Sequence, residues 1–125
     1  MINRGAARLH GWLAWLFAAS IVIQVFLAGL AIFGATRDFG LHIDFGYTVV
    51  GLLALAVLLS AVIGGLPRRT IGLSLLLLVL YVVQTALPQA KASLPVIAAF
   101  HPVNALALLG LGIILARRAG AAHTA

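Results

Sequence analysis

The sequence predicts an all-α transmembrane four-helix bundle made of two repeated helical hairpins. Hydrophobic residues make up 64% of the 125 residues and charged residues only 8%, whereas soluble domains average about 45–50% and 25%. The apolar residues fall into four runs of about 20, the length that crosses a hydrocarbon core of about 30 Å at about 1.5 Å per residue. We therefore expect residues 1–125 to form a single integral membrane domain in a lipid bilayer.

Charged residues and prolines delimit the four spans. The first span follows a basic segment, but its apolar stretch exceeds the about 7–15 residues of a signal peptide, so we expect an uncleaved anchor. Pro67 and Arg68 separate the second span from the third, Pro88 and Pro95 separate the third from the fourth, and Arg117 follows the last. The expected spans are residues 12–35, 43–63, 70–87 and 95–116.

The distribution of basic residues predicts the orientation. The N-terminal segment, the middle loop and the C-terminal segment carry two each, whereas the other two loops carry one each, Arg37 and Lys91. By the positive-inside rule both termini face the cytoplasm, and an even number of spans agrees. We expect a multi-pass protein of the bacterial plasma membrane, N-in/C-in, with Trp12 and Trp15 at the inner interface.

The few polar residues recur at an offset of about 60, which indicates an internal repeat. Two such hairpins would be related by a pseudo-twofold axis along the membrane normal. The alternative is chance, because helices rich in Leu, Ala and Gly align easily, but Gln and His are costly in lipid and rarely share a spacing by accident. The paired positions are Arg8 and Arg68, Gln24 and Gln84, His42 and His101, Gly46 and Ala105, and Gly51 and Gly110.

Two histidines, His42 and His101, lie within or beside the second and fourth spans, toward the outer half of the membrane. Neutral imidazole is a good ligand for haem iron and other transition metals. If the pseudo-twofold axis passes between these spans, the two rings face each other, as a bis-histidine b-type haem requires. We therefore predict His42 and His101 as metal ligands of a haem b.

Neighbouring residues agree with a haem site. A small residue one turn after each histidine would leave space for a porphyrin, two glutamines would orient an imidazole or a ligand, and a cation in each outer loop would pair with a propionate. These residues are Gly46 and Ala105, Gln24 and Gln84, and Arg37 and Lys91.

Counting residues from the inner arginines places the two histidines at different membrane depths, which argues against a shared haem. His101 lies about 24 Å along a helix from Arg117, but His42 lies about 39 Å from Arg68. One haem cannot bridge that difference in depth. The mismatch shrinks if residues 64–66 leave the helix, if Arg117 and Arg118 snorkel on a longer fourth helix, or if the second helix tilts, but it does not vanish.

The same residues also allow purely structural roles. His42 would cap the second helix beside Asp44, and His101 would lie at its helix start or at a kink, because Pro102 disfavours a helix before it. Gln24, Gln84 and Asn104 would bond neighbouring helices. Ser60 and Gly64 form a small-xxx-small pair suited to close helix contact or to dimerisation. His10 and His123 receive no role.

Several classes of protein lack their required residues. With no Cys there is no disulfide, thiolate metal site or thiol redox chemistry. The only acids, Asp38 and Asp44, lie at the outer edge, which argues against a proton-coupled exporter with a buried carboxylate. No hydrolytic triad is present. The charge of +6 comes from basic residues outside the spans and does not indicate nucleic-acid binding.

Four short motifs in the sequence resemble those of a known family. FLAGLAIFG after Val25, LHIDFG at Leu41–Gly46, LYVVQ at Leu80–Gln84 and FHPVNA at Phe100–Ala105 resemble a family of short, uncharacterised four-helix bacterial membrane proteins. The layout also resembles one four-helix half of haem A synthase, whose halves place a haem-ligating His on the second and fourth helices. That resemblance implies a ligand role for His42 and His101. It does not imply haem A synthesis, because the chain lacks that enzyme's acidic residue, cysteine pair and second half.

These observations lead to a hypothesis and two alternatives. The chain is expected to bind a b-type haem between the second and fourth helices, for electron transfer or haem handling, with a membrane redox partner or as a homodimer. The main alternative is a non-catalytic accessory or assembly subunit of a membrane complex, whose polar residues only hold helices together. An oligomeric channel or carrier would need a polar path through the inner half, where the second and fourth spans are apolar.

Overall fold

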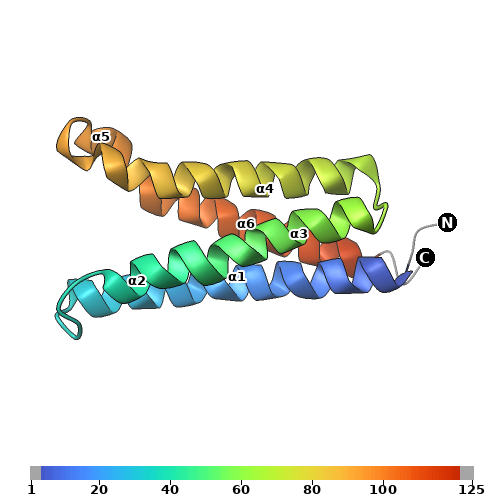
Figure 1. The fold of residues 1–125 in the computed structure, drawn as a ribbon, viewed down its shortest axis with the longest axis horizontal. Coiled ribbons are helices and arrows are strands. Elements are labelled where there is room, and N and C mark those ends of the chain that lie inside the picture. Colours follow the sequence, from blue (N-terminus) through green and yellow to red (C-terminus); the bar gives the residue numbers. More distant parts are fainter. Residues whose placement is uncertain (1–3, 122–125) are drawn as a thin grey trace.

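The computed structural model describes residues 4–121, which form helices and no strand (Figure 1). The predicted all-α fold is confirmed. A π-helical segment, Gly46–Val50, joins α2 to α3, and a 3-10 helix, Leu87–Ala92, follows α4. The α-helices are α1 (Arg4–Ile32), α2 (Gly40–Phe45), α3 (Gly51–Ile63), α4 (Arg68–Ala86), α5 (Pro95–Ala98) and α6 (Phe100–Ala121).

Within residues 4–121, four helical stretches are long and apolar enough to cross a membrane, in agreement with the predicted number of spans. Their ends differ from the prediction, because hydropathy finds the apolar part of a helix whereas backbone hydrogen bonding continues into polar flanks. The first stretch begins at Arg4, well before residue 12, and the fourth continues beyond Arg117. The stretches are Arg4–Ile32, Gly40–Ile63, Arg68–Ala92 and Pro95–Gly120.

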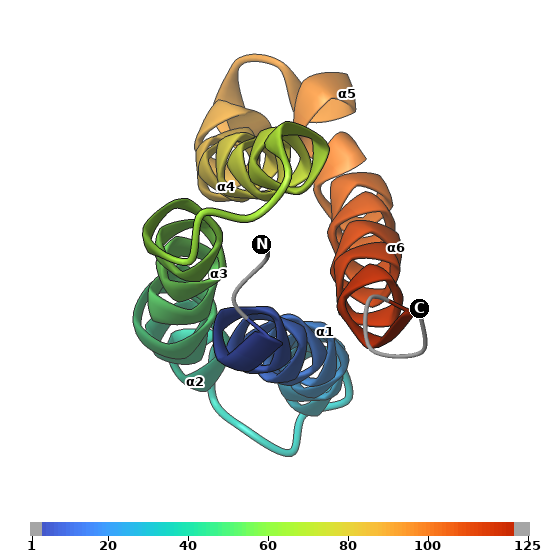
Figure 2. The same ribbon diagram turned by 90° about the vertical axis from the view of Figure 1, so that its right-hand side faces the viewer.

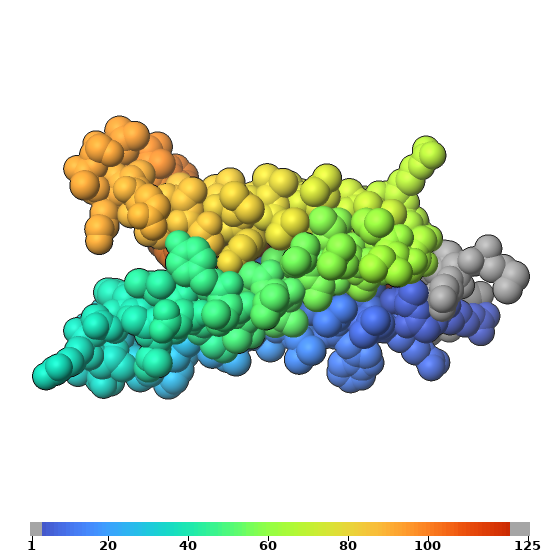
Figure 3. Space-filling view, in the orientation of Figure 1, coloured from blue at the N-terminus to red at the C-terminus, as the bar shows by residue number. Residues whose placement is uncertain are grey.

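The four stretches form a ring in which each packs against its neighbours in sequence, and α6 closes the ring on α1 (Figure 2). The second and fourth stretches therefore lie diagonally across the bundle. α1 begins and α6 ends at one end, which we call the terminal end (Figure 1). At the opposite end, the loop end, the tips of the two hairpins stand apart (Figure 3).

The bundle is apolar on the outside as well as in the core. Phe17, Leu77 and Leu108 are fully buried between the helices, while Phe26 and Leu52 are 63% and 68% exposed. Helices that are hydrophobic on every side are typical of membrane spans, because lipid covers the outward faces. The surface thus supports a multi-pass membrane protein.

Glycines with left-handed backbones end two of the helices. Gly34, after α1, has φ 75°, and Gly65, after α3, has φ 59°. A residue in this conformation turns the chain so that freed carbonyls are satisfied, as when the N–H of Leu66 bonds to the oxygen of Ala61 at 3.0 Å. The second stretch therefore stops at Ile63, several residues before Arg68.

Small residues bring α1 and α6 close together. A Cβ added to Gly11 would lie 2.9 Å from Cβ of Ala119, and one added to Gly112 would lie 3.1 Å from Cδ1 of Phe17. Helices in lipid associate without a hydrophobic driving force, so the van der Waals packing that this close approach allows holds them together. The two hairpins are thus joined along the α1–α6 seam.

Candidate functional site

The two histidines singled out from the sequence meet at the loop end of the bundle. His42 lies in α2 and His101 in the first turn of α6, on the two diagonal stretches. Their rings are half-buried, with centroids 6.1 Å apart and an interplanar angle of 68°. The ring of Phe39 also packs edge-on against His42, at 6.1 Å between centroids.

This contact overturns the objection based on membrane depth. The count from the arginines assumed that Arg68 and Arg117 stand level, but Gly64 and Gly65 leave the helix before Arg68. α6, in contrast, continues past Arg117 to Ala121. Both effects reduce the difference in depth between the two histidines, as the sequence allowed. The two imidazoles therefore lie side by side.

Each imidazole makes the same bond within its own hairpin. Nδ1 of His42 donates to the backbone oxygen of Gln24 at 3.0 Å, and Nδ1 of His101 donates to that of Gln84 at 3.0 Å. A carbonyl can only accept, so Nδ1 carries the hydrogen in both rings and Nε2 keeps its lone pair. The equivalent pairs support the predicted repeat of two hairpins.

The side chain of Gln84 extends the network in the second hairpin. Its amide nitrogen donates to Nε2 of His101 at 3.3 Å, and its Oε1 accepts from the amide of Asn104 at 2.8 Å. The same Asn104 nitrogen donates to the backbone oxygen of Leu80 at 2.9 Å. The roles of donor and acceptor are consistent throughout, so this half of the site is polar and satisfied.

The first hairpin lacks this network. The amide nitrogen of Gln24 lies against Gly46, where a Cβ would stand, and Oε1 of Gln24 is buried without a hydrogen-bond partner. Nε2 of His42 likewise has no partner among the described residues. The two halves of the site are therefore alike in backbone contacts and different in side-chain contacts.

Tyr81 occupies the space left by a second glycine. A Cβ on Gly51 would lie 2.5 Å from the Tyr81 hydroxyl, which donates to the backbone oxygen of Gly46 at 3.1 Å. This oxygen belongs to the π-helical segment, a feature that often occurs at functional sites. Gly46, which was expected to leave space for a porphyrin, is thus covered by Gln24, and Gly51 is covered by Tyr81, whereas a Cβ at Gly110 would meet nothing within 4 Å.

Residues 24–91, more than half of the chain, match the model of a family of unknown function, DUF6220. The chain belongs to this family. No curated protein and no solved structure matches it. The match includes the Gln24–His42 pair and Gln84 and ends before His101, so it takes in three of the four residues that form the equivalent bonds in the DUF6220 chain.

The remaining predicted residues of the DUF6220 chain lie toward the same end of the bundle as the pair. Ala105 is half-buried in α6, one turn after His101. Arg37 and Lys91 are exposed in the two connections of the loop end, the end that holds the histidines. Among the described residues, no three His, Asp or Glu side chains form a metal-binding group.

Of the structural alternatives for the two histidines, the one for His42 is wrong and the one for His101 is confirmed. His42 does not cap its helix, since the side chain that bonds the start of α2 is that of Asp38, which accepts from the N–H of Gly40 at 2.8 Å, and the imidazole of His42 bonds across to α1. His101 lies at a helix start, as that alternative expected, since it is the second residue of α6 and the chain breaks just before, at Ala99 between α5 and α6. Asn104 and the glutamines do bond neighbouring helices, as expected.

His10, which received no role from the sequence, is fully buried at the terminal end. Its Nδ1 lies 3.1 Å from the backbone oxygen of Val57 and 3.0 Å from Oγ of Ser60, while Nε2 is buried without a partner. The small-xxx-small pair of Ser60 and Gly64 is thus used inside the bundle, where a Cβ on Gly64 would meet Ala6. The expected first span began at residue 12, whereas the helix that could cross the membrane begins at Arg4, so no signal in the sequence indicated the burial of His10. His123 lies outside the described residues.

Proposed function

We propose that the chain binds one b-type haem between α2 and α6, with Nε2 of His42 and of His101 as the axial ligands. The observation that carries this proposal is the pair of rings 6.1 Å apart, each held at Nδ1 by a backbone carbonyl. Bound haem would supply one-electron chemistry, so the protein would pass electrons or hold haem for a partner.

The donor geometry supports the proposal. Two imidazoles that bind one metal ion through Nε2, at about 2.0 Å each, have ring centroids about 6 Å apart. Histidines that ligate metals generally donate their other N–H to a carbonyl or carboxylate, which fixes the tautomer and the ring orientation. His42 and His101 both satisfy this condition through Gln24 and Gln84.

Three side chains would have to move for a porphyrin to enter. The Gln84 amide would leave Nε2 of His101, and Gln24 and Tyr81 would turn away from the two glycines. Moving the Gln24 amide breaks no hydrogen bond of its oxygen, because that oxygen has no partner. Arg37 and Lys91, exposed at the loop end, are the cations available to the propionates.

The proposed setting is the bacterial plasma membrane, with both termini in the cytoplasm and the histidine pair toward the outer face. The counts of basic residues support this orientation. A membrane redox partner or a second copy of the chain would exchange electrons with the haem. The layout shared with one half of haem A synthase supports the ligand role of the two histidines alone.

A second candidate is an accessory or assembly subunit in which the polar residues only hold helices together. The observation that favours it is the network of Asn104, Gln84 and His101, because each of its side chains has hydrogen-bond partners without a cofactor. Such interhelical bonds contribute about 0.6 to 2 kcal/mol in membranes.

Visible spectra separate the two candidates. The protein is expressed with haem precursor, purified in mild detergent, and measured oxidised and dithionite-reduced, alongside His42→Ala and His101→Ala. Haem ligated by both residues gives an intense Soret band and sharp reduced bands that both variants lose. His10→Leu, which removes a histidine from the opposite end, is the control and keeps them.

Circular dichroism checks that each variant retains its helices. A colourless wild type that stays colourless after haem is added would overturn the haem proposal and leave the accessory subunit. Bands that persist in both histidine variants would also contradict the assignment of the ligands.

A further inference from the structure

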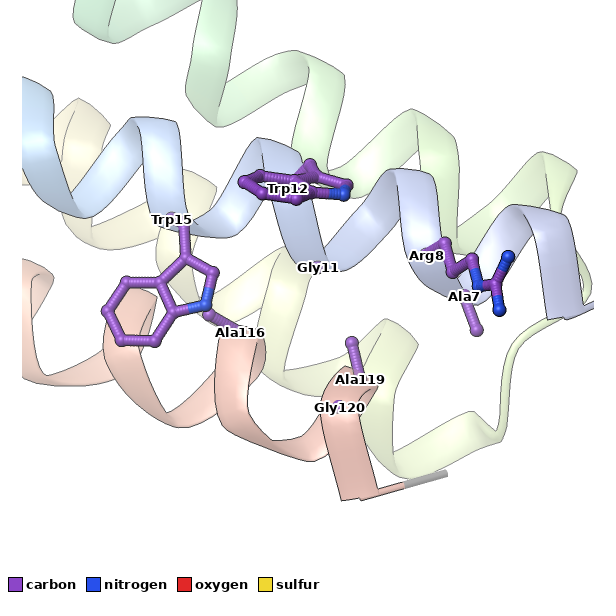
Figure 4. A pocket seen from close by; sticks show the side chains of 8 residues that line it. All are labelled: Ala7, Arg8, Gly11, Trp12, Trp15, Ala116, Ala119 and Gly120. Carbon is purple, nitrogen blue, oxygen red and sulfur yellow. The ribbon is translucent and has the colours of Figure 1, made fainter. Parts of the chain in front are cut away.

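An open groove of about 630 Å³ lies on the α1–α6 seam at the terminal end, far from the histidine pair (Figure 4). Its floor consists of small residues, among them Gly11, Ala116 and Ala119. The floor must be small, because Gly11 and Ala119 hold the two helices in close contact. The volume is in the range of about 300–1,000 Å³ that is typical of small-molecule sites.

Two tryptophans border this groove. Trp12 and Trp15 both line it and are 69% and 45% exposed, and Figure 4 shows Trp12 along α1 and the indole of Trp15 reaching from α1 toward α6, beside Ala116. Indole rings concentrate at the level of lipid headgroups, where one part of the ring is apolar and the N–H is wet. The groove therefore lies at the depth where a lipid changes from headgroup to acyl chain.

The charge in and around the groove is positive. Arg8 lines it, is exposed, and has no acidic partner among the described residues. Both acidic residues of the chain, Asp38 and Asp44, belong to the loop end, while Arg4 and Arg117 lie at the terminal end with Arg8. An arginine beside an apolar groove at the membrane surface is complementary to a phosphate with a hydrocarbon tail.

We propose that this groove binds an anionic phospholipid of the leaflet that meets the terminal end. The lipid phosphate pairs with Arg8, and an acyl chain lies over the small residues of the α1–α6 seam, between the two indoles. Basic pockets between membrane helices recognise anionic headgroups by this combination of charge and apolar contact. The site is independent of the histidine pair and of any cofactor there.

The two tryptophans make the groove directly observable. They are the only tryptophans of the chain and both line the groove, so all indole emission comes from this place. The intact protein is reconstituted in nanodiscs that contain a small fraction of phosphatidylglycerol or phosphatidylcholine with brominated acyl chains, which quench indole on contact. The quenching is compared at equal mole fraction and low ionic strength.

We expect the brominated anionic lipid to quench at about fivefold lower mole fraction than the zwitterionic one, since one arginine near a lipid phosphate contributes about 1 kcal/mol. Arg8→Gln removes this preference while it leaves both indoles in place. The matched control is Arg68→Gln, which removes the same charge at the repeat-related position, at the start of α4 and outside the groove. The control retains the preference.

Three results would overturn the proposal. Equal quenching by the two lipids would mean that ordinary surrounding lipid covers the groove. Equal loss of the preference for anionic lipid in Arg8→Gln and Arg68→Gln would mean that the terminal end attracts anions only through its overall charge. Relief of the anionic-lipid quenching by millimolar inorganic phosphate would mean that the groove takes free phosphate and not a lipid.

Discussion

The imidazole rings of His42 and His101 lie 6.1 Å apart at the loop end of the bundle, although each is bonded only within its own hairpin. Contact between them is made possible by the diagonal placement of the second and fourth stretches. The surrounding side chains differ, because Gln84 belongs to a satisfied network whereas Gln24 does not. The two sides of this near-symmetric site should therefore respond differently to substitution.

Gln84→Leu should destabilise the protein more than Gln24→Leu. Loss of the Gln84 amide leaves Nε2 of His101 and one N–H of Asn104 without partners, at a cost of about 1–3 kcal/mol. Leucine at position 24 removes an oxygen that is already unpaired, so its effect should be close to zero. Reversible unfolding in mixed micelles measures both free energies. Equal costs would show that the Gln84 network adds nothing.

Gly51→Ala should be destabilising, and Tyr81→Phe should partly rescue it. The new Cβ would lie 2.5 Å from the Tyr81 hydroxyl, and removal of that oxygen leaves the ring carbon at 3.0 Å as the closest atom. Tyr81→Phe alone should cost about 0.5–1.5 kcal/mol, because it loses the bond to the oxygen of Gly46. A double-mutant cycle tests the coupling, and additive effects would contradict direct contact.

His10→Leu should be tolerated where His10→Ala is not. Truncation to alanine leaves a cavity in the core at a cost of about 2–5 kcal/mol. Leucine roughly keeps the volume and removes a nitrogen that has no partner, while the Ser60 hydroxyl still bonds the oxygen of Val57 at 2.9 Å. Reversible unfolding in mixed micelles compares the free energies of the two variants. Equal destabilisation by both variants would point to a role for Nε2 that the hydrogen bonds do not explain.

Two glycines of α6 should differ in their response to alanine. Gly110→Ala should stabilise the protein by about 0.5–1 kcal/mol, because its Cβ meets no atom within 4 Å and alanine favours a helix. Gly112→Ala should be less favourable, since its Cβ would press on Phe17 at 3.1 Å and on Ala18 at 3.4 Å. Thermal unfolding of the two variants makes the comparison. The reverse order would mean that the α1–α6 seam is loose.

The proposed orientation can be tested with single cysteines, because the chain has none of its own. Lys91→Cys should react with a membrane-impermeant maleimide in intact cells, and Arg69→Cys only after the cells are opened. The two positions lie at opposite ends of the bundle, at exposed sites. The opposite pattern would reverse the orientation, and labelling of both in intact cells would contradict a membrane-spanning bundle.

Much of the candidate site was predictable because polar residues are costly in lipid, so each one inside a span indicates a specific contact or function. His42, His101, Gln24 and Gln84 stand out for this reason, and their shared spacing led to the two hairpins. The contacts of Tyr81 and Asn104 were not predictable in this way. Which carbonyl such a side chain reaches depends on how its helix is rotated, and an almost uniformly apolar helix carries no periodic signal of its inward face.

The sequence by itself determined the number of spans and the end of the bundle at which the histidines lie, since length and hydropathy decide both. Only the tertiary structure decided that the two imidazoles meet. That outcome depended on the end of α3 at Ile63 and on how far α6 continues past Arg117, and a count along the chain treats both as straight helix. The burial of His10 likewise followed from packing, because helix rotation is chosen by the fit between helices and not by the hydropathy of any one of them.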